Sequence, residues 1–254
     1  MRRQFSLLLC AVQFLTRLPV PASPGFQADW INRSARYFPL AGQLTGLLSA
    51  AVLLFAAQFW STWIAAALGL LTATLITGAL HEDGLADTAD GFCGGHDPAH
   101  RLAIMKDSRI GAYGVLALGF CTVLKLASLA ALSPFLAACS LIAAHGVARA
   151  ATVIVMHRLP YAGDPASAKI SIANLPPTRT EMWIALLLAC WPLFLLHYID
   201  IMLSLALCAI LTLALARAAN RLIGGQRGDV LGAVEQLCEA GFLLGCAAKF
   251  GAIH

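Results

Sequence analysis

Residues 62–90 read TWIAAALGLLTATLITGALHEDGLADTAD and decide the class of fold. The stretch 62–80 carries no charged side chain. A run of this length comes close to the roughly 20 apolar residues that an α-helix needs to cross a bilayer. Four carboxylates follow at once, at 82–90. The sequence therefore predicts a membrane helix that opens onto a polar surface.

Three of these carboxylates share one face of the predicted helix. Asp83, Asp87 and Asp90 stand at i, i+4 and i+7, within roughly 60° of one another, while Glu82 falls about 100° away. If they continue the apolar helix, they lie at its C-terminal end, where the helix dipole is also negative. Like charges placed in this way need a cation between them, and the alternative is a solvated acidic helix end.

All-oxygen ligands suit Mg²⁺, or Mn²⁺, better than zinc. We therefore predict a metal site formed by Asp83, Asp87 and Asp90, which are also the first candidates for catalytic residues. Glu82 is a weaker ligand that can reach a second ion or support the others from outside. A metal at a membrane surface suggests a phosphorylated substrate.

The composition predicts an all-α, polytopic integral membrane bundle, forming a single domain over residues 1–254. The chain is 59% hydrophobic and 12% charged, about half the charged fraction of a soluble domain. An apolar stretch at 5–20, interrupted by Arg17 and Pro19, is expected to be interfacial or half-inserted rather than a cleavable signal. About seven transmembrane helices, within a range of six to eight, are expected at 37–60, 62–80, 111–132, 134–156, 182–199, 200–216 and 231–250.

The positive charges fall on one side of this topology. Segments 1–36, 81–110, 157–181 and 217–230 hold nearly all of the arginines and lysines, and most of the acidic residues as well. The positive-inside rule puts the N-terminus, these loops and the site in the cytoplasm. Topology explains the net charge of +4, and no basic stripe interleaved with aromatic residues indicates a nucleic-acid partner.

The segment Lys106-Asp107-Ser108-Arg109 stands directly before a predicted span. A lysine and the planar fork of an arginine can together hold diphosphate oxygens. Because the acidic cluster lies across the same loop, we favour phosphate binding. Interfacial anchoring of the span end is the alternative.

Charged residues also occur at membrane depth. Arg149, one turn after His145, is expected to contact substrate or to form an ion pair at the site, with a structural pair to Glu235 as the alternative. Glu235 and Glu239 share one face of the last predicted span. Lys125 is alone on its span and marks a polar interior position.

Two loops frame the acidic helix. Segment 91–95, GFCGG, is expected to end it because glycine accepts positive φ, and Asp97-Pro98 should start the next helix. Segment 224–229, GGQRGD, returns flexible backbone, a cation and a carboxylate to the same face. Asp229 can complete the metal shell or act as a base, and an N-cap role is the equal alternative.

Several motifs together closely resemble the cobalamin synthase family, the adenosylcobinamide-GDP ribazoletransferases. They are HEDGLADTADG at 81–91, IMKDSRIG at 104–111, FLTRLPVP at 14–21, FPL at 38–40, and GGQ, GD and LGA at 224–226, 228–229 and 231–233. The chain departs from the family at Arg227, where threonine usually stands, and at Ala168, where glycine usually precedes the lysine that corresponds to Lys169.

The resemblance implies the last assembly step of coenzyme B12, in which α-ribazole or its 5′-phosphate joins adenosylcobinamide-GDP and GMP is released. It also implies Mg²⁺ and residence in the bacterial inner membrane. Together with the motifs, it makes the following residues candidates for substrate binding: Arg17, His81, Lys106, Asp107, Arg109, Arg149, Lys169 and Gln226.

The expected chemistry is metal-assisted phosphoryl transfer, with Asp229, His81 or a metal-shell carboxylate as the general base. A membrane transferase of the CDP-alcohol phosphatidyltransferase or prenyl type is the first alternative. A cation-coupled transporter is the second, although the chain lacks the repeated halves and two-sided charges typical of one. A homo-oligomer is left open.

Overall fold

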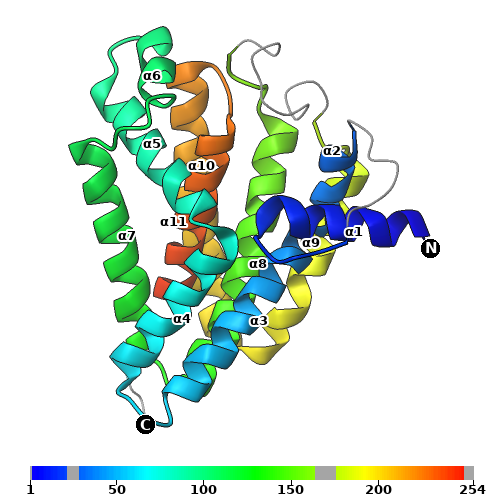
Figure 1. Cartoon of the computed structure of the whole chain (residues 1–254), viewed down its shortest axis with the longest axis vertical. Coiled ribbons are helices and arrows are strands. Elements are labelled where there is room, and N and C mark those ends of the chain that lie inside the picture. Colours follow the sequence, from blue (N-terminus) through cyan, green and yellow to red (C-terminus); the bar gives the residue numbers. More distant parts are fainter. Residues whose placement is uncertain (1, 22–28, 164–175, 249–254) are drawn as a thin grey trace.

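Apolar runs form α-helices in this computed structural model, which describes residues 2–21, 29–163 and 176–248 (Figure 1). Within these ranges no β-strand forms, and the extended segments meet only in an isolated bridge between Tyr161 and Gln226. The predicted all-α class is therefore confirmed. The elements are α1 (Arg2–Leu15), α2 (Trp30–Ser34), η1 (Ala35–Tyr37), α3 (Phe38–Ala56), α4 (Thr62–Thr77), α5 (Leu80–Gly94), α6 (Pro98–Ile104), α7 (Ala112–Ala130), α8 (Pro134–Arg158), α9 (Arg179–Cys190), η4 (Trp191–Leu195), α10 (Tyr198–Ile223) and α11 (Gly228–Cys246).

Four helical segments are long and apolar enough to cross a membrane: Trp30–Ala56, α7, α8 and α10. The bent pair α4 and α5 would make a fifth. These segments fit a multi-pass helical membrane protein, as predicted, but the expected count of seven is not confirmed. The predicted span 62–80 qualifies only as part of the bent pair, and the predicted spans 182–199 and 231–250 are not among the candidates.

The predicted span 182–199 is broken after Cys190. A 3₁₀ turn, η4, follows α9, and α10 begins only at Tyr198. Pro192 lacks the N–H that would continue the helix. The break is held by Gln43, whose side chain donates to the Leu188 carbonyl and accepts from Trp191 Nε1, both at 2.8 Å.

The predicted span 231–250 corresponds to α11, which is the central helix of the bundle. It packs against α5, α7, α8 and α10, and most of its side chains are buried. It also carries Asp229, Glu235 and Glu239. Its surroundings are therefore protein rather than lipid, whereas only 17% of the most apolar window of α10 is buried.

The connections sort to the two ends of the bundle. Figure 1 shows the α5–α6 and α10–α11 connections at one end and the α3–α4 and α7–α8 turns at the other. This matches the predicted grouping of charged loops on one side. At the opposite end Trp60 and Trp63 are exposed, as is typical of residues at a membrane interface. Helix α1 lies across the long axis of the bundle (Figure 1), in agreement with a helix that does not cross.

The acidic segment does not continue α4. Gly78 (φ 67°) and Ala79 (φ 59°) are both left-handed, and they turn the chain by 89° before α5 begins. The expectation that the carboxylates lie at a helix C-terminus is therefore wrong. Glu82 and Asp83 stand in the first turn of α5, where the helix dipole is positive and stabilises negative charge.

Candidate active site

Asp83, Asp87 and Asp90 lie on one face of α5, here called the acidic face, and they are increasingly buried along the helix. Asp83 is exposed, Asp87 is half-buried and Asp90 is buried. The negative charges of Asp83, Asp90 and Asp229 all act on Asp87. In the described part of the chain no lysine, arginine or histidine forms an ion pair with Asp83 or Asp87. No cationic side chain of the described residues is therefore paired with these two carboxylates to offset their mutual repulsion.

Asp229 reaches this face because two glycines let α5 and α11 touch. A Cβ atom on Gly84 would lie 2.7 Å from the Asp229 carbonyl oxygen and 3.2 Å from Gly232 Cα, and one on Gly232 would lie 3.2 Å from His81 Cα. Both positions must lack a side chain for the backbones to approach so closely. Carboxylates more than a hundred residues apart in sequence thereby meet at one surface.

The N-cap of α11 is Arg227, not Asp229, so the N-cap alternative for Asp229 is wrong. Arg227 makes no side-chain cap bond, and its Nε lies 3.8 Å from Asp229 Oδ2. A hydroxyl at position 227 would be a good N-cap. Arg227 therefore leaves the start of α11 without a side-chain cap and places a cation beside Asp229.

Asp90 also connects two helices, which the sequence did not predict. Its two carboxylate oxygens accept the backbone N–H groups of Gly111 (2.7 Å) and Gly114 (2.9 Å), at the N-terminus of α7. Asp90 thus fastens α5 to α7. It is a weaker candidate ligand than Asp83 or Asp87, because both of its oxygens are already engaged.

Glu82 points away from the acidic face, in agreement with the predicted ranking of ligands. Its Oε1 accepts the Thr74 hydroxyl at 3.0 Å, and Oε2 is buried without a hydrogen-bond partner among the described residues. Glu82 lines the same internal cavity as His81. It stands behind the acidic face rather than on it.

An open groove of about 450 Å³ runs beside the bend between α4 and α5. Arg17, Gly78, Leu80 and Asp83 are among its lining residues. The Arg17 guanidinium packs on Gly78, where any Cβ would clash with it, and it lies 3.5 Å from the Gly78 carbonyl oxygen. The structure therefore brings Arg17 to the edge of the acidic face.

Helix α6 begins as predicted. Asp97 Oδ1 accepts the His100 N–H at 2.9 Å, and this bond is the main cause that lowers the Asp97 pKa. The expectation of positive φ at the end of α5 is wrong, because its C-cap Gly95 has φ −88°. Glycine is needed there for space: a Cβ on Gly95 would clash with Arg101, and one on Gly91 would lie 2.5 Å from Met105 Cγ.

The predicted phosphate-binding segment lies at the surface after α6. Arg109 and Lys106 are exposed. The Asp107 carboxylate accepts two bonds from Arg109, to Nε at 3.1 Å and Nη2 at 2.6 Å. These bonds lower the Asp107 pKa to about 2. Arg109 is therefore oriented by Asp107 before any substrate arrives.

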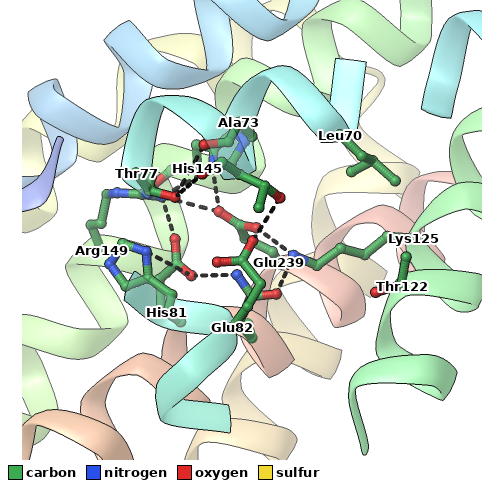
Figure 2. A pocket seen from close by; sticks show the side chains of 13 residues that line it. Leu70, Ala73, Thr77, His81, Glu82, Thr122, Lys125, His145, Arg149 and Glu239 are labelled. Atoms are coloured by element: carbon green, nitrogen blue, oxygen red, sulfur yellow. Dashed lines mark hydrogen bonds and ion pairs between the residues drawn. The ribbon is translucent and has the colours of Figure 1, made fainter. Parts of the chain in front are cut away.

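A second charged group is enclosed inside the bundle, around a cavity of about 50 Å³. Figure 2 shows side chains of α4, α5, α7, α8 and α11 converging there. Arg149 Nη1 lies 2.5 Å from Glu235 Oε1 and 3.0 Å from Glu239 Oε1. The predicted alternative, a structural pair with Glu235, is confirmed. With 2% of its surface exposed, Arg149 faces this group, and a role in binding substrate stays a prediction.

Sequence reasoning missed most of this network. Lys125 does occupy a polar interior position, as expected, but its Nζ contacts Glu239 Oε2 at 2.6 Å and Gln236 Oε1 at 2.7 Å. His145 also pairs with Glu239. The available signal was the balance of charges at membrane depth, since lone cations there need carboxylate partners.

Gln226 is buried in a bridge between two loops. Its backbone N–H donates to the Pro160 carbonyl, and its carbonyl accepts from the Ala162 N–H, both at 2.8 Å. Gly225 is needed beside it, because a Cβ would clash with Pro160. Gln226 Oε1 has no hydrogen-bond partner among the residues described. Lys169, the other candidate from this side, lies outside the described residues.

Comparison with known proteins places the chain among relatives of a single kind. The family model described as cobalamin-5-phosphate synthase matches residues 7–247. Proteins named adenosylcobinamide-GDP ribazoletransferase match at 44% identity in Azorhizobium caulinodans (92% of each chain), 40% in Leptothrix cholodnii (95% of each) and 38% in Shewanella piezotolerans (94% of this chain, 93% of the relative). No solved structure matches.

Proposed function

The chain belongs to the cobalamin-5-phosphate synthase family, and on this premise we propose that it joins α-ribazole, or its 5′-phosphate, to adenosylcobinamide-GDP and releases GMP. The acidic face carries the proposal. Asp83 lines an open groove, and Asp87 lies close enough to Asp83 and to Asp229 for their charges to interact; among the described residues no cation is paired with Asp83 or Asp87. The diphosphate of the substrate is negatively charged as well. A metal ion between the diphosphate and the acidic face would offset the repulsion between them.

The donor set fits Mg²⁺, with Mn²⁺ as a substitute, because the ligands are all oxygens. We assign the metal to Asp83, Asp87 and Asp229. Asp90 supports them by fastening α5 to the start of α7, and Glu82 supports them from the interior. When bound, Mg²⁺ neutralises the charge of the diphosphate and of the departing GMP.

Cationic side chains at the same end of the bundle hold the substrate. Arg17 lies at the edge of the groove, while Lys106 and the oriented Arg109 are open to solvent. Each can donate to non-bridging phosphate oxygens.

A free ribose hydroxyl of the ribazole, one that is not phosphorylated in the 5′-phosphate substrate either, attacks the phosphorus on the cobinamide side, and the bond from that phosphorus to the departing GMP breaks in line with it. If Asp229 does not complete the metal shell, it is the alternative base for the hydroxyl proton, because its side chain is 29% exposed. His81 is buried beside Glu235 instead, with 3.7 Å between Nδ1 and Oε2. We further propose that this end faces the cytoplasm at the bacterial inner membrane, as the positive charge of its loops indicates.

The decisive experiment supplies purified full-length protein with adenosylcobinamide-GDP, α-ribazole and Mg²⁺, and measures GMP release. We expect GMP that depends on both substrates and is lost with EDTA. Absence of product with this pair, together with product from a CDP-activated lipid, would replace the proposal with a phosphatidyltransferase.

A further inference from the structure

The contact between Gly84 and Gly232 divides the interface of α5 and α11 into two zones. Toward the start of α11 stands Asp229, beside the acidic face. Toward its middle stands Glu235, which is 1% exposed and faces His81. The same pair of backbones therefore carries an open group of acids and an enclosed one.

In the enclosed zone each carboxylate already has a fixed cation. Glu239 contacts Lys125 of α7 at 2.6 Å, and Glu235 contacts Arg149 of α8 at 2.5 Å. Buried charges are costly unless they are paired. The Lys125–Glu239 pair is hydrogen-bonded, whereas the Arg149–Glu235 pair is a close ion contact in which Glu235 Oε1 has no hydrogen bond among the described residues. The two pairs connect α11 to α7 and α8.

The enclosed zone also reaches α5. Glu235 Oε2 accepts a bond from Gln236 Nε2 at 3.1 Å and lies 3.7 Å from His81 Nδ1. His81 stands in the first turn of α5, two residues before Asp83. Glu235 therefore packs close to the turn that bears the first carboxylate of the acidic face, without a hydrogen bond to it.

A second metal site is the competing interpretation of this cluster. Ligand atoms of His145, Glu235 and Glu239 lie within 4.8 Å of one another. However, Arg149 and Lys125 lie within 2.5–3.0 Å of these carboxylates. A divalent ion would have to displace Lys125 and Arg149, which already neutralise these carboxylates. We therefore do not interpret the cluster as a metal site.

We propose that Lys125, Arg149, Glu235 and Glu239 are positioning residues: through His81 they set the first turn of α5 against α11, and so hold Asp83 and Asp87 beside Asp229 in the geometry that binds metal. The inference rests on the proposed metal site of the acidic face. It predicts that charge balance inside the bundle controls metal affinity at the open groove, although no residue of the network touches that ion.

The test measures Mn²⁺ binding by electron paramagnetic resonance on the purified full chain in detergent. We expect Lys125→Met and Glu239→Gln each to weaken Mn²⁺ binding about 10–100-fold, as loss of a group behind the ligands does. The double variant removes one charge of each sign and should return to within about threefold of the parent. His81→Leu leaves no unpaired charge, so it should fold and still weaken Mn²⁺ binding.

A matched control is Gln43→Leu, which also removes two buried hydrogen bonds but on α3, against the α9 break. It should lower thermal stability and leave Mn²⁺ affinity unchanged. Unchanged Mn²⁺ affinity in folded His81→Leu, or a double variant as weak as the single ones, would overturn the proposal. Mn²⁺ binding that is absent in the parent, or unaffected by Asp87→Asn, would instead refute the metal site itself.

Discussion

The acidic face and the enclosed charge network are built on the same two helices, yet they treat carboxylates in opposite ways. On the acidic face, Asp83 and Asp87 have no paired cation among the described residues. In the enclosed network, Glu235 and Glu239 are matched by Arg149 and Lys125. Neutralised carboxylates hold the fold together, and those left unneutralised are available for a metal and a diphosphate.

The largest effect is expected on the open side. Asp87→Asn should lower turnover at least about 10³-fold, because a central metal ligand and its charge are lost. Membrane insertion should be unchanged. Thermal stability should be unchanged or higher, since the substitution removes the repulsion of Asp87 by the neighbouring aspartates. GMP release measured against Mg²⁺ concentration checks this. Mg²⁺-dependent turnover near the parental rate would contradict the assignment.

On the enclosed side, Lys125→Met should destabilise the protein by about 3–5 kcal/mol, because Glu239 then keeps a buried charge without its closest cation. Thermal unfolding in detergent is the measurement. Adding Glu239→Gln should recover more than half of the loss. A single variant as stable as the parent would show that water reaches this cavity and screens the charges.

The boundary between the two regions is tested by Gly84→Ala, whose Cβ would meet the Asp229 backbone at 2.7 Å. Overpacking of this kind costs about 1–3 kcal/mol, and separation of the helices should also reduce GMP release. The matched control is Gly119→Ala on α7, where nothing lies within 4 Å. There alanine should be neutral or stabilising, by up to about 1 kcal/mol.

Asp90→Asn sharpens the distinction between ligand and support. One of the two N–H groups at the start of α7 loses its acceptor, which should cost about 1–3 kcal/mol of stability. We expect GMP release to fall far less than in Asp87→Asn. A loss of turnover equal to that of Asp87→Asn, with stability unchanged, would make Asp90 a direct ligand.

The smallest effect is expected at Asp107→Asn. The pKa of Asp107 is held at about 2, below its ordinary 3.8, so its pair with Arg109 persists above about pH 4 and is lost only as pH falls toward 2. Exposed pairs contribute little. The KM for adenosylcobinamide-GDP should therefore change less than about threefold at pH 5–9. A larger change would show that Asp107 itself contacts substrate.

Apolar runs and local capping signals were enough to predict much of the fold. The helices α7, α8 and α10 and the cap at Asp97 follow from hydropathy and from residues close in sequence. The acidic face and the separate direction of Glu82 follow from helical geometry alone. These features depend on neighbours within a few residues.

The features that were missed depend on distant partners. Lys125 and Gln236 are 111 residues apart, and Asp90 and Gly114 are 24 apart; nothing local identifies either pair. The break before α5 was missed for another reason. It requires a positive φ at Ala79, and alanine rarely adopts that conformation.

That bend also makes the length of the connection between α4 and α5 critical. Each residue added to or removed from it would change how α5 is placed and oriented relative to α4, because the two left-handed residues alone set the bend. A single insertion would turn Asp83 and Asp87 away from Asp229, with no change in the composition of the acidic segment. The two residues 78–79 therefore set which side of α5 faces the groove. A homologue with the same acidic motif but a different number of residues at this joint would present another side of α5 to the groove.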